Sequence, residues 1–292
     1  MKNELIAKNI VSLKSDLQRV HSVNKKLKLL KDRFKDSECV ILTAGPSFKD
    51  NNKVDLINLL KDKLVISVKQ TVIGLEEYTD FHLVNPFNYV KYNNILDRTI
   101  KISLSANSIF YPIPFYDADI NLKLIKDHSL HESIAIKQNY EKFRLDKEVK
   151  RPLGPGIMHE LGIYLPVLLG CKRIYVIGWD LGNKNDSLIE RYYEKENIFL
   201  KIRRSIILHS LPFFNIFYNR IENLVRLGLF SIGIDVKINL PGVTIDEAKL
   251  IANSTNKLYK WLKSKNIDLY VISNRSLLDE IIPRVKITDL IK

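Results

Sequence analysis

The chain of 292 residues is predicted to be an α/β protein with a doubly wound, mostly parallel sheet and an N-terminal helical arm. From Glu38 onward, short apolar runs alternate with helix-like segments, which is the pattern of a parallel sheet with helices on its faces. Some of these runs are continuously apolar, as in strands buried on both sides. Several end in polar residues, at the edge where open α/β sheets bind ligands.

Composition narrows the classes of function. Lys and Arg number 46 against 33 acidic residues, which gives a net charge of +13 and suits a phosphorylated substrate or anionic lipid. Nucleic acid is a weaker candidate, because no binding motif focuses the lysines. No signal peptide and no apolar run of about 18 to 20 residues is present, and Cys39 and Cys171 lack metal or disulfide spacing. We therefore expect a cytoplasmic protein.

Residues 1–36 are predicted to form the helical arm, ahead of a catalytic domain at 37–292. Apolar residues recur there in steps of four and three, at Ile6, Ile10, Leu13, Leu17, Val20 and Leu27, with Asn24 on the same seam. Two interpretations remain open. The seam can form a coiled coil, making a homo-oligomer through residues 1–35, or an amphipathic helix that folds back on its own domain. Residues 22–26 could also divide the helix in two.

The remaining elements follow from hydrophobic periodicity and turn residues. A charged stretch at 108–150 is expected to form a flap or helical insert, and a second helical segment is expected near 200–262. Strands are predicted at 39–42, 64–68, 81–84, 100–104, 173–178 and 268–273, and helices at 54–60, 157–169 and 244–262.

The first candidate site is the turn after the first strand, Gly45, Pro46 and Ser47. Glycine lets backbone amides approach a ligand, and proline suits the first turn of a helix. A strand that leads into a helix N-terminus favours an anion, so a nucleotide phosphate would fit there. A tight turn that binds nothing is the alternative.

Polar residues also end the next two strands. Lys69 and Gln70 follow the second strand, and Asn85 follows the third, so we expect them to line one cleft with the Gly45 turn. Residues 117–119 read Asp-Ala-Asp, formally a metal-binding DxD pattern, although a helix start explains these aspartates equally well. A divalent metal is therefore compatible with the sequence but not required.

The second candidate stretch is 151–180. Arg151 precedes a glycine-rich helix start at Gly154 and Gly156, and its guanidinium could meet a phosphate. An apolar helix and a strand follow, and the strand ends at Gly178 and Asp180. Asp180 could orient the ribose of a nucleotide or act as an alternative base, or it could be an ordinary strand-end cap.

These stretches resemble the bacterial CMP-sialic-acid lipooligosaccharide sialyltransferases and their relatives. The Gly45 turn is similar to that family's GPSL-type loop, and 151–180 is similar to its Arg-x-x-Ser-Gly and LGYKEIYLSGID segments. A third patch, with Asn274 and Ser276, is similar to its late Asn-Ser-Leu-Leu turn. Asn85-Pro86 matches an Asn-Pro after the family's third strand.

The chain also departs from that family. Lys69 stands where the family has Asn, and Gly-Pro-Gly replaces the Ser of its arginine motif. No histidine occurs between Ile232 and Trp261, where the family's general base lies. His209 is the only histidine after Asp180, and a buried structural role is its simpler interpretation.

The resemblance implies a Rossmann-like fold of the sialyltransferase type. It also implies a glycosyltransferase of bacterial lipopolysaccharide biosynthesis, moving sialic acid, a related nonulosonic acid or Kdo from a CMP-activated donor to a cell-surface glycan or glycolipid. His209 and Asp180 are then the candidate catalytic residues, with no obligatory cofactor. Residues 213–229 are either core or a peripheral contact with the anionic inner membrane. Alternative functions are a pterin pyrophosphokinase-like enzyme and a non-catalytic scaffold with a vestigial nucleotide cleft.

Overall fold

The computed structural model describes residues 2–84, 94–106, 118–124, 161–180, 245–273 and 276–291. Within them lies a seven-stranded sheet in the order β5-β4-β3-β2-β1-β6-β7, and every strand pair in it is parallel. This arrangement confirms the α/β fold with a parallel sheet. The strands are β1 (Glu38–Leu42), β2 (Leu64–Val68), β3 (Phe81–Val84), β4 (Ile100–Ala106), β5 (Ile120–Leu124), β6 (Arg173–Ile177) and β7 (Asp268–Ile272).

The chain builds the sheet outward from its middle. Strands β1 to β5 follow one another toward one edge, and the chain then returns to place β6 on the other side of β1. The strand order therefore reverses between β1 and β6, and this place is the topological switch point of the sheet. Open α/β sheets bind ligands at their switch point, beyond the carboxyl ends of the strands.

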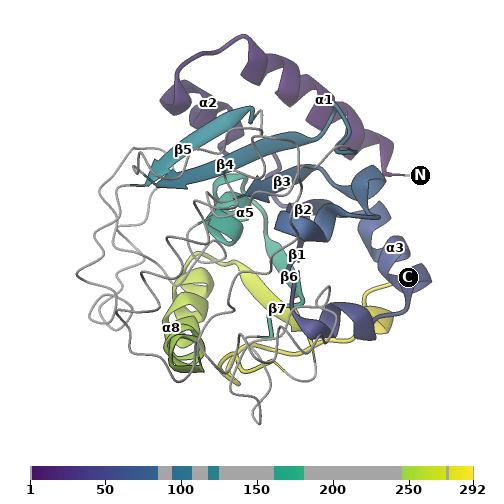
Figure 1. Ribbon diagram of the computed structural model, residues 1–292, viewed down its shortest axis with the longest axis vertical. Helices are drawn as coiled ribbons and strands as arrows, with labels where there is room; N and C mark the ends of the chain where they lie inside the picture. Colours follow the sequence, from purple (N-terminus) through teal and green to yellow (C-terminus); the bar gives the residue numbers. More distant parts are fainter. Residues whose placement is uncertain are drawn as a thin grey trace, which may run out of the picture.

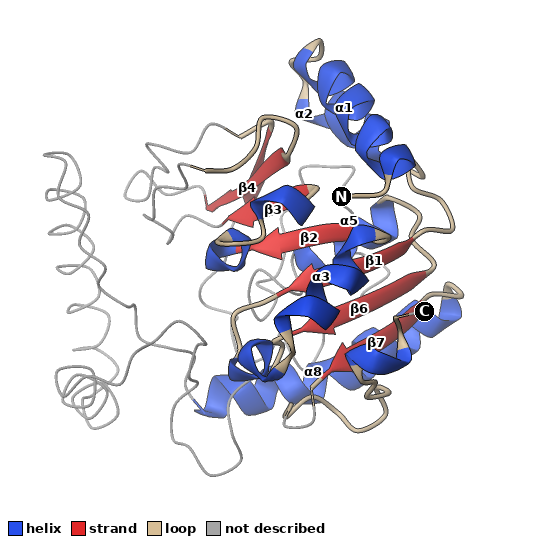
Figure 2. Cartoon of the chain, turned by 90° about the vertical axis from the view of Figure 1, so that its right-hand side faces the viewer, coloured by secondary structure: helices blue, strands red, loops and turns tan. Residues whose placement is uncertain are grey.

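Helices cover both faces of the sheet (Figure 2). Alternate residues of each strand point to opposite faces, so Ile41 contributes to one apolar cluster and Val40 to another. The first cluster includes side chains of α1 (Glu4–Gln18), α2 (Val23–Leu30), α5 (Tyr164–Leu168) and α8 (Ile245–Ser264). The second includes α3 (Lys53–Lys61) and the short helical turn at Ile287–Asp289.

The arm folds back on the sheet (Figure 1). The seam residues Ile10, Leu13, Leu17 and Leu27 are at most 2% exposed and belong to the same apolar cluster as the sheet. In this structure the seam is therefore covered by the chain itself rather than presented as an open coiled-coil stripe. The helix divides close to the predicted break, with α1 ending at Gln18 and α2 beginning at Val23.

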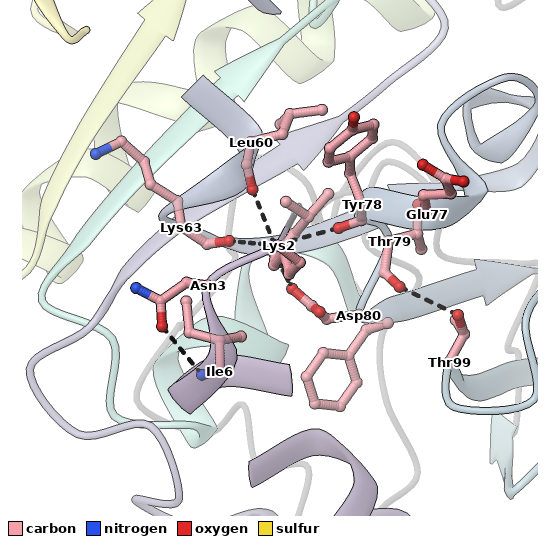
Figure 3. Close-up of polar contacts among 12 residues, drawn as sticks. Lys2, Asn3, Ile6, Leu60, Lys63, Glu77, Tyr78, Thr79, Asp80 and Thr99 are labelled. Atoms are coloured by element: carbon pink, nitrogen blue, oxygen red, sulfur yellow. Dashed lines mark hydrogen bonds and ion pairs between the residues drawn. The ribbon is translucent and has the colours of Figure 1, made fainter. Parts of the chain in front are cut away.

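A buried lysine ties the start of the arm to the sheet (Figure 3). Lys2 Nζ lies 2.8 Å from the Asp80 carboxylate and also donates to the carbonyl oxygens of Leu60 and Tyr78, at 2.9 and 3.2 Å. Burial lowers the pKa of Lys2, and the attraction of Asp80 opposes that shift. Asp80 also contacts Arg98 at 3.2 Å. The carboxylate and both cations form one largely desolvated cluster.

The structure corrects one expectation about 108–150. Ile120–Leu124 forms the edge strand β5, paired with β4, inside the stretch predicted to be a flap or helical insert. Most of the rest of that stretch, and residues 200–244, lie outside the described residues. In the described part of the chain, no helix has both the length and the apolar character needed to cross a bilayer.

Candidate functional site at the switch point

The loops after β1 and β6 run together at the point where the strand order reverses. Leu42 pairs with Ile177 at the ends of these strands. Beyond them, the Thr43 amide donates to the Ile177 carbonyl at 2.8 Å, and the Gly45 amide donates to the Gly178 carbonyl at 2.7 Å. The two loops that the sequence singled out separately are therefore in direct contact.

Glycine is required at both contact positions. A Cβ built on Gly45 would lie 2.2 Å from the Gly178 carbonyl oxygen and 2.6 Å from the Asp180 carboxylate. One built on Gly178 would lie 2.2 Å from the Thr43 carbonyl oxygen, and Gly178 has a φ of +78°. These glycines thus permit the close approach of two protein loops.

The Asp180 carboxylate joins three strand ends. Oδ2 accepts a hydrogen bond from the Ser47 amide at 2.6 Å, and Oδ1 accepts from the Ser47 hydroxyl at 2.6 Å. The Ser273 hydroxyl, directly after β7, donates to Oδ1 at 2.6 Å. Asp180 is 1% exposed, and a buried carboxylate needs such donors to offset the loss of water. One side chain therefore fixes the ends of β1, β6 and β7.

This network changes the interpretation of the predicted phosphate loop. The amides of Gly45 and Ser47 both donate within the chain, and Pro46 has no amide hydrogen. In this structure the protein's own carboxylate occupies the place at the Ser47 amide where an anion was expected. The segment that follows is also only a short 3-10 turn, Pro46–Asp50, rather than an α-helix.

The end of β2 reaches the same edge of the sheet. Thr71 Oγ1 lies 2.9 Å from the Leu42 carbonyl oxygen, so the Lys69–Val72 turn is tied to the end of β1. Lys69 has a φ of +56°, a left-handed conformation that is uncommon for a side chain with Cβ. Lys69 and Gln70 therefore follow β2 beside the end of β1, as the sequence predicts.

A buried histidine supports this turn. His82 of β3 is 0% exposed, and its Nε2 donates to the Lys69 carbonyl at 2.9 Å. Burial, which outweighs the opposing effect of the hydrogen bond to Lys69 and is aided by the nearby Lys101, lowers the pKa of His82 to about 4, so the ring is neutral at neutral pH. Sequence reasoning missed His82 because it lies inside an apolar strand. The available signal was its position two residues before the strand's end.

The late stretch that contains Ser276 contacts the end of the 151–180 stretch. The Ser276 hydroxyl donates to the Trp179 carbonyl at 2.7 Å, and the Leu277 amide donates to the Asp180 carbonyl at 2.8 Å. Six predicted site residues lie outside the described residues: Asn85, Arg151, Gly154, Gly156, His209 and Asn274.

The described half of the DxD pattern has a structural role. Asp119 accepts a hydrogen bond from the Lys101 amide at 2.7 Å and lies 3.5 Å from Lys14 Nζ of the arm. It also precedes a strand rather than a helix. Across the described ranges, no group of at least three His, Cys, Asp or Glu side chains is arranged to hold a metal ion.

Comparisons of the chain with protein-family models, with curated proteins and with solved structures returned no match. The fold and the site define a class, an α/β protein of the Rossmann-like kind with polar loops tied together at the switch point of its parallel sheet. A more specific assignment depends on the chemistry of that site.

Proposed function

We propose that the chain is a glycosyltransferase that moves an acidic sugar from a CMP-activated donor to a glycan or glycolipid acceptor. One observation supports this proposal above the others. The stretches that resemble the sialyltransferases, at Gly45 to Ser47, Gly178 to Asp180 and Ser276, are far apart in sequence but joined by hydrogen bonds at the switch point. Ligands of open α/β sheets bind beyond this edge.

The proposed reaction is a displacement at the anomeric carbon. An acceptor hydroxyl oxygen forms the new bond to that carbon, its proton passes to a base, and the bond to the CMP phosphate oxygen breaks with the electron pair leaving on CMP. Lys69, and Arg151 beyond the described residues, would neutralise the charge that develops on the phosphate. This chemistry needs no obligatory metal.

Asp180 suits an orienting role better than that of the base. Its carboxylate accepts three hydrogen bonds from Ser47 and Ser273 and is 1% exposed, so a proton acceptor there would have to give up bonds that hold the loops. His209 remains the candidate base, and it must come within about 3 Å of the acceptor hydroxyl.

The proposal is tested by ligand binding followed by donor hydrolysis. We expect CMP to raise the melting temperature more than UDP, GDP or ATP, and the protein to release CMP from CMP-sialic acid or CMP-Kdo. Lys69→Gln should weaken CMP binding. Lys53→Gln, which removes the same charge from an exposed position on α3, should leave CMP binding unchanged.

Other outcomes would select the alternatives. Stabilisation by ATP, with pyrophosphoryl transfer to a pterin, would replace the transferase by the kinase-like enzyme. Stabilisation by none of the four nucleotides would leave the non-catalytic scaffold.

A further inference from the structure

The outward side of the arm is basic. Residues 17–31 contain no Asp or Glu, and five of them are Lys or Arg. Lys25, Lys28 and Lys31 recur at every third position and are exposed, whereas Leu27 and Leu30 between them are buried. The three lysines therefore lie along the side of α2 and its C-terminus that faces away from the sheet.

The outward side of α1 adds apolar side chains. Leu5 and Val11 are 70% and 54% exposed, and the exposed Lys8 lies between them at the same spacing of three residues. The helices lie side by side on the outside of the sheet (Figures 1 and 2). Arg33 Nη2, just after α2, lies 3.1 Å from Ser12 Oγ of α1. Together these residues form the arm surface, defined as Leu5, Lys8, Val11, Lys25, Lys28 and Lys31.

We propose that the arm surface docks the protein on an anionic lipid bilayer. Lysines spread along two helices suit a diffuse layer of negative head groups, whose attraction for Lys and Arg is additive. Exposed Leu5 and Val11 can enter the head-group region, as apolar residues of interfacial helices do. Glu4 and Asp32 are exposed acidic residues next to Leu5 and Lys31, and the partly exposed Asp16 of α1 lies 3.8 Å from Arg33, which offsets its charge.

The fold holds this surface ready for binding. Lys14 Nζ donates to the Thr99 carbonyl at 2.8 Å, and Lys26 Nζ donates to the Asp119 carbonyl at 2.5 Å. These two lysines fasten the arm to the sheet, while Lys25 and Lys28 face outward. The arm therefore does not have to fold on contact with lipid, which lowers the entropic cost of docking. This proposal does not depend on the proposed glycosyltransferase activity.

Flotation of the full chain with vesicles tests the proposal. The wild type should bind phosphatidylcholine vesicles that contain phosphatidylserine, and should bind much less to phosphatidylcholine alone. Lys25→Gln/Lys28→Gln should weaken binding about 25-fold, at about fivefold for each lysine near the surface. The matched control is Lys257→Gln/Lys260→Gln, which removes two exposed lysines of the same spacing from α8.

The control pair should change binding by no more than about twofold, because charges beyond a Debye length are screened. Equal losses from the two pairs would overturn the proposal, and so would equal binding of the wild type to neutral vesicles.

A third variant separates lipid from nucleic acid. Leu5→Ser/Val11→Ser should weaken vesicle binding, because it removes the apolar contacts but no charge. Full vesicle affinity in this variant would overturn the assignment to lipid. So would a wild type that binds a single-stranded RNA oligonucleotide more tightly than the anionic vesicles, because the basic residues would then serve nucleic acid.

Discussion

Replacing His82 by glutamine should remove part of the protein's sensitivity to acid. The His82 ring is 0% exposed and donates to the Lys69 carbonyl at 2.9 Å, and burial lowers its pKa from 6.5 to about 4. Glutamine can still donate a hydrogen bond to that carbonyl, but it does not titrate. The substitution therefore isolates the proton linkage of this one side chain.

The sign follows from proton binding. Between the folded pKa of about 4 and the unfolded value of 6.5, the unfolded chain binds the additional proton. The contribution of His82 is therefore complete above pH 6.5 and is lost as the pH falls toward 4. Because one pKa unit corresponds to about 1.4 kcal/mol, lowering the pH from about 7.5 to about 4.5 should cost about 2.5 kcal/mol through His82 alone.

Urea unfolding of the wild type and of His82→Gln across that pH range measures the effect. The difference in unfolding free energy between the two proteins should move by about 2.5 kcal/mol in favour of the variant as the pH falls. His21→Gln, at an exposed position, serves as control and should show no such change. Parallel stability curves, or a His82 pKa near 6.5 by NMR titration of the wild type, would refute the reasoning.

Further substitutions test the contacts that hold the structure together, all by urea unfolding at neutral pH. Ser47→Ala removes a hydroxyl hydrogen bond to the buried Asp180 carboxylate and should lower the free energy of unfolding by about 2 kcal/mol. The control Ser22→Ala, at an exposed helix start with no side-chain cap, should lower it by less than about 0.5 kcal/mol. Equal losses would contradict the role of the carboxylate. Gly45→Ala should lower the free energy of unfolding by about 3 kcal/mol or more, because the new Cβ would overlap backbone atoms of Gly178. The control Gly74→Ala, where φ is +80° but no atom lies near the new Cβ, should lower it by only about 1 kcal/mol. Lys2→Met removes one of the two cations that contact the buried Asp80 carboxylate, which keeps Arg98, and should lower the free energy of unfolding by about 2 to 3 kcal/mol. A change below about 1 kcal/mol would show that the anchor does not stabilise the fold.

The central strands could be read directly from the sequence. Largely apolar runs bounded by turn residues predicted β2 and β3 with the bounds observed, because strands buried on both faces consist mainly of apolar side chains. Ser67 and His82 are the buried polar exceptions in these two strands. The edge strand β5 was missed. Apolar and polar residues alternate in its sequence, Ile-Asn-Leu-Lys-Leu, which lies within a charged stretch. Because Asn121 is exposed, this edge strand lacks the continuous apolar run that marks a central strand.

The site was predicted in its parts but not in its connections. The Gly-Pro turn after the first strand indicated Ser47, and strand-end position indicated Asp180, because parallel strands present their carboxyl ends at one edge. The hydrogen bond from the Ser47 amide to the Asp180 carboxylate depends on the distance between two loops, and no local sequence pattern encodes that distance. Ser273 was missed although the same strand-end rule applies to it.

The Asp180 junction also bears on how the protein folds. Its hydrogen bonds to Ser47 and Ser273 span 133 and 93 residues of chain, so both require costly loop closure before they contribute any stability. During synthesis, Ser47 and Asp180 leave the ribosome before β7 and Ser273 do, so the junction is complete only after β7 has been made. A chain halted before β7 would leave a carboxylate without one of its donors, and such incomplete products should be recognised and degraded more readily than the finished protein.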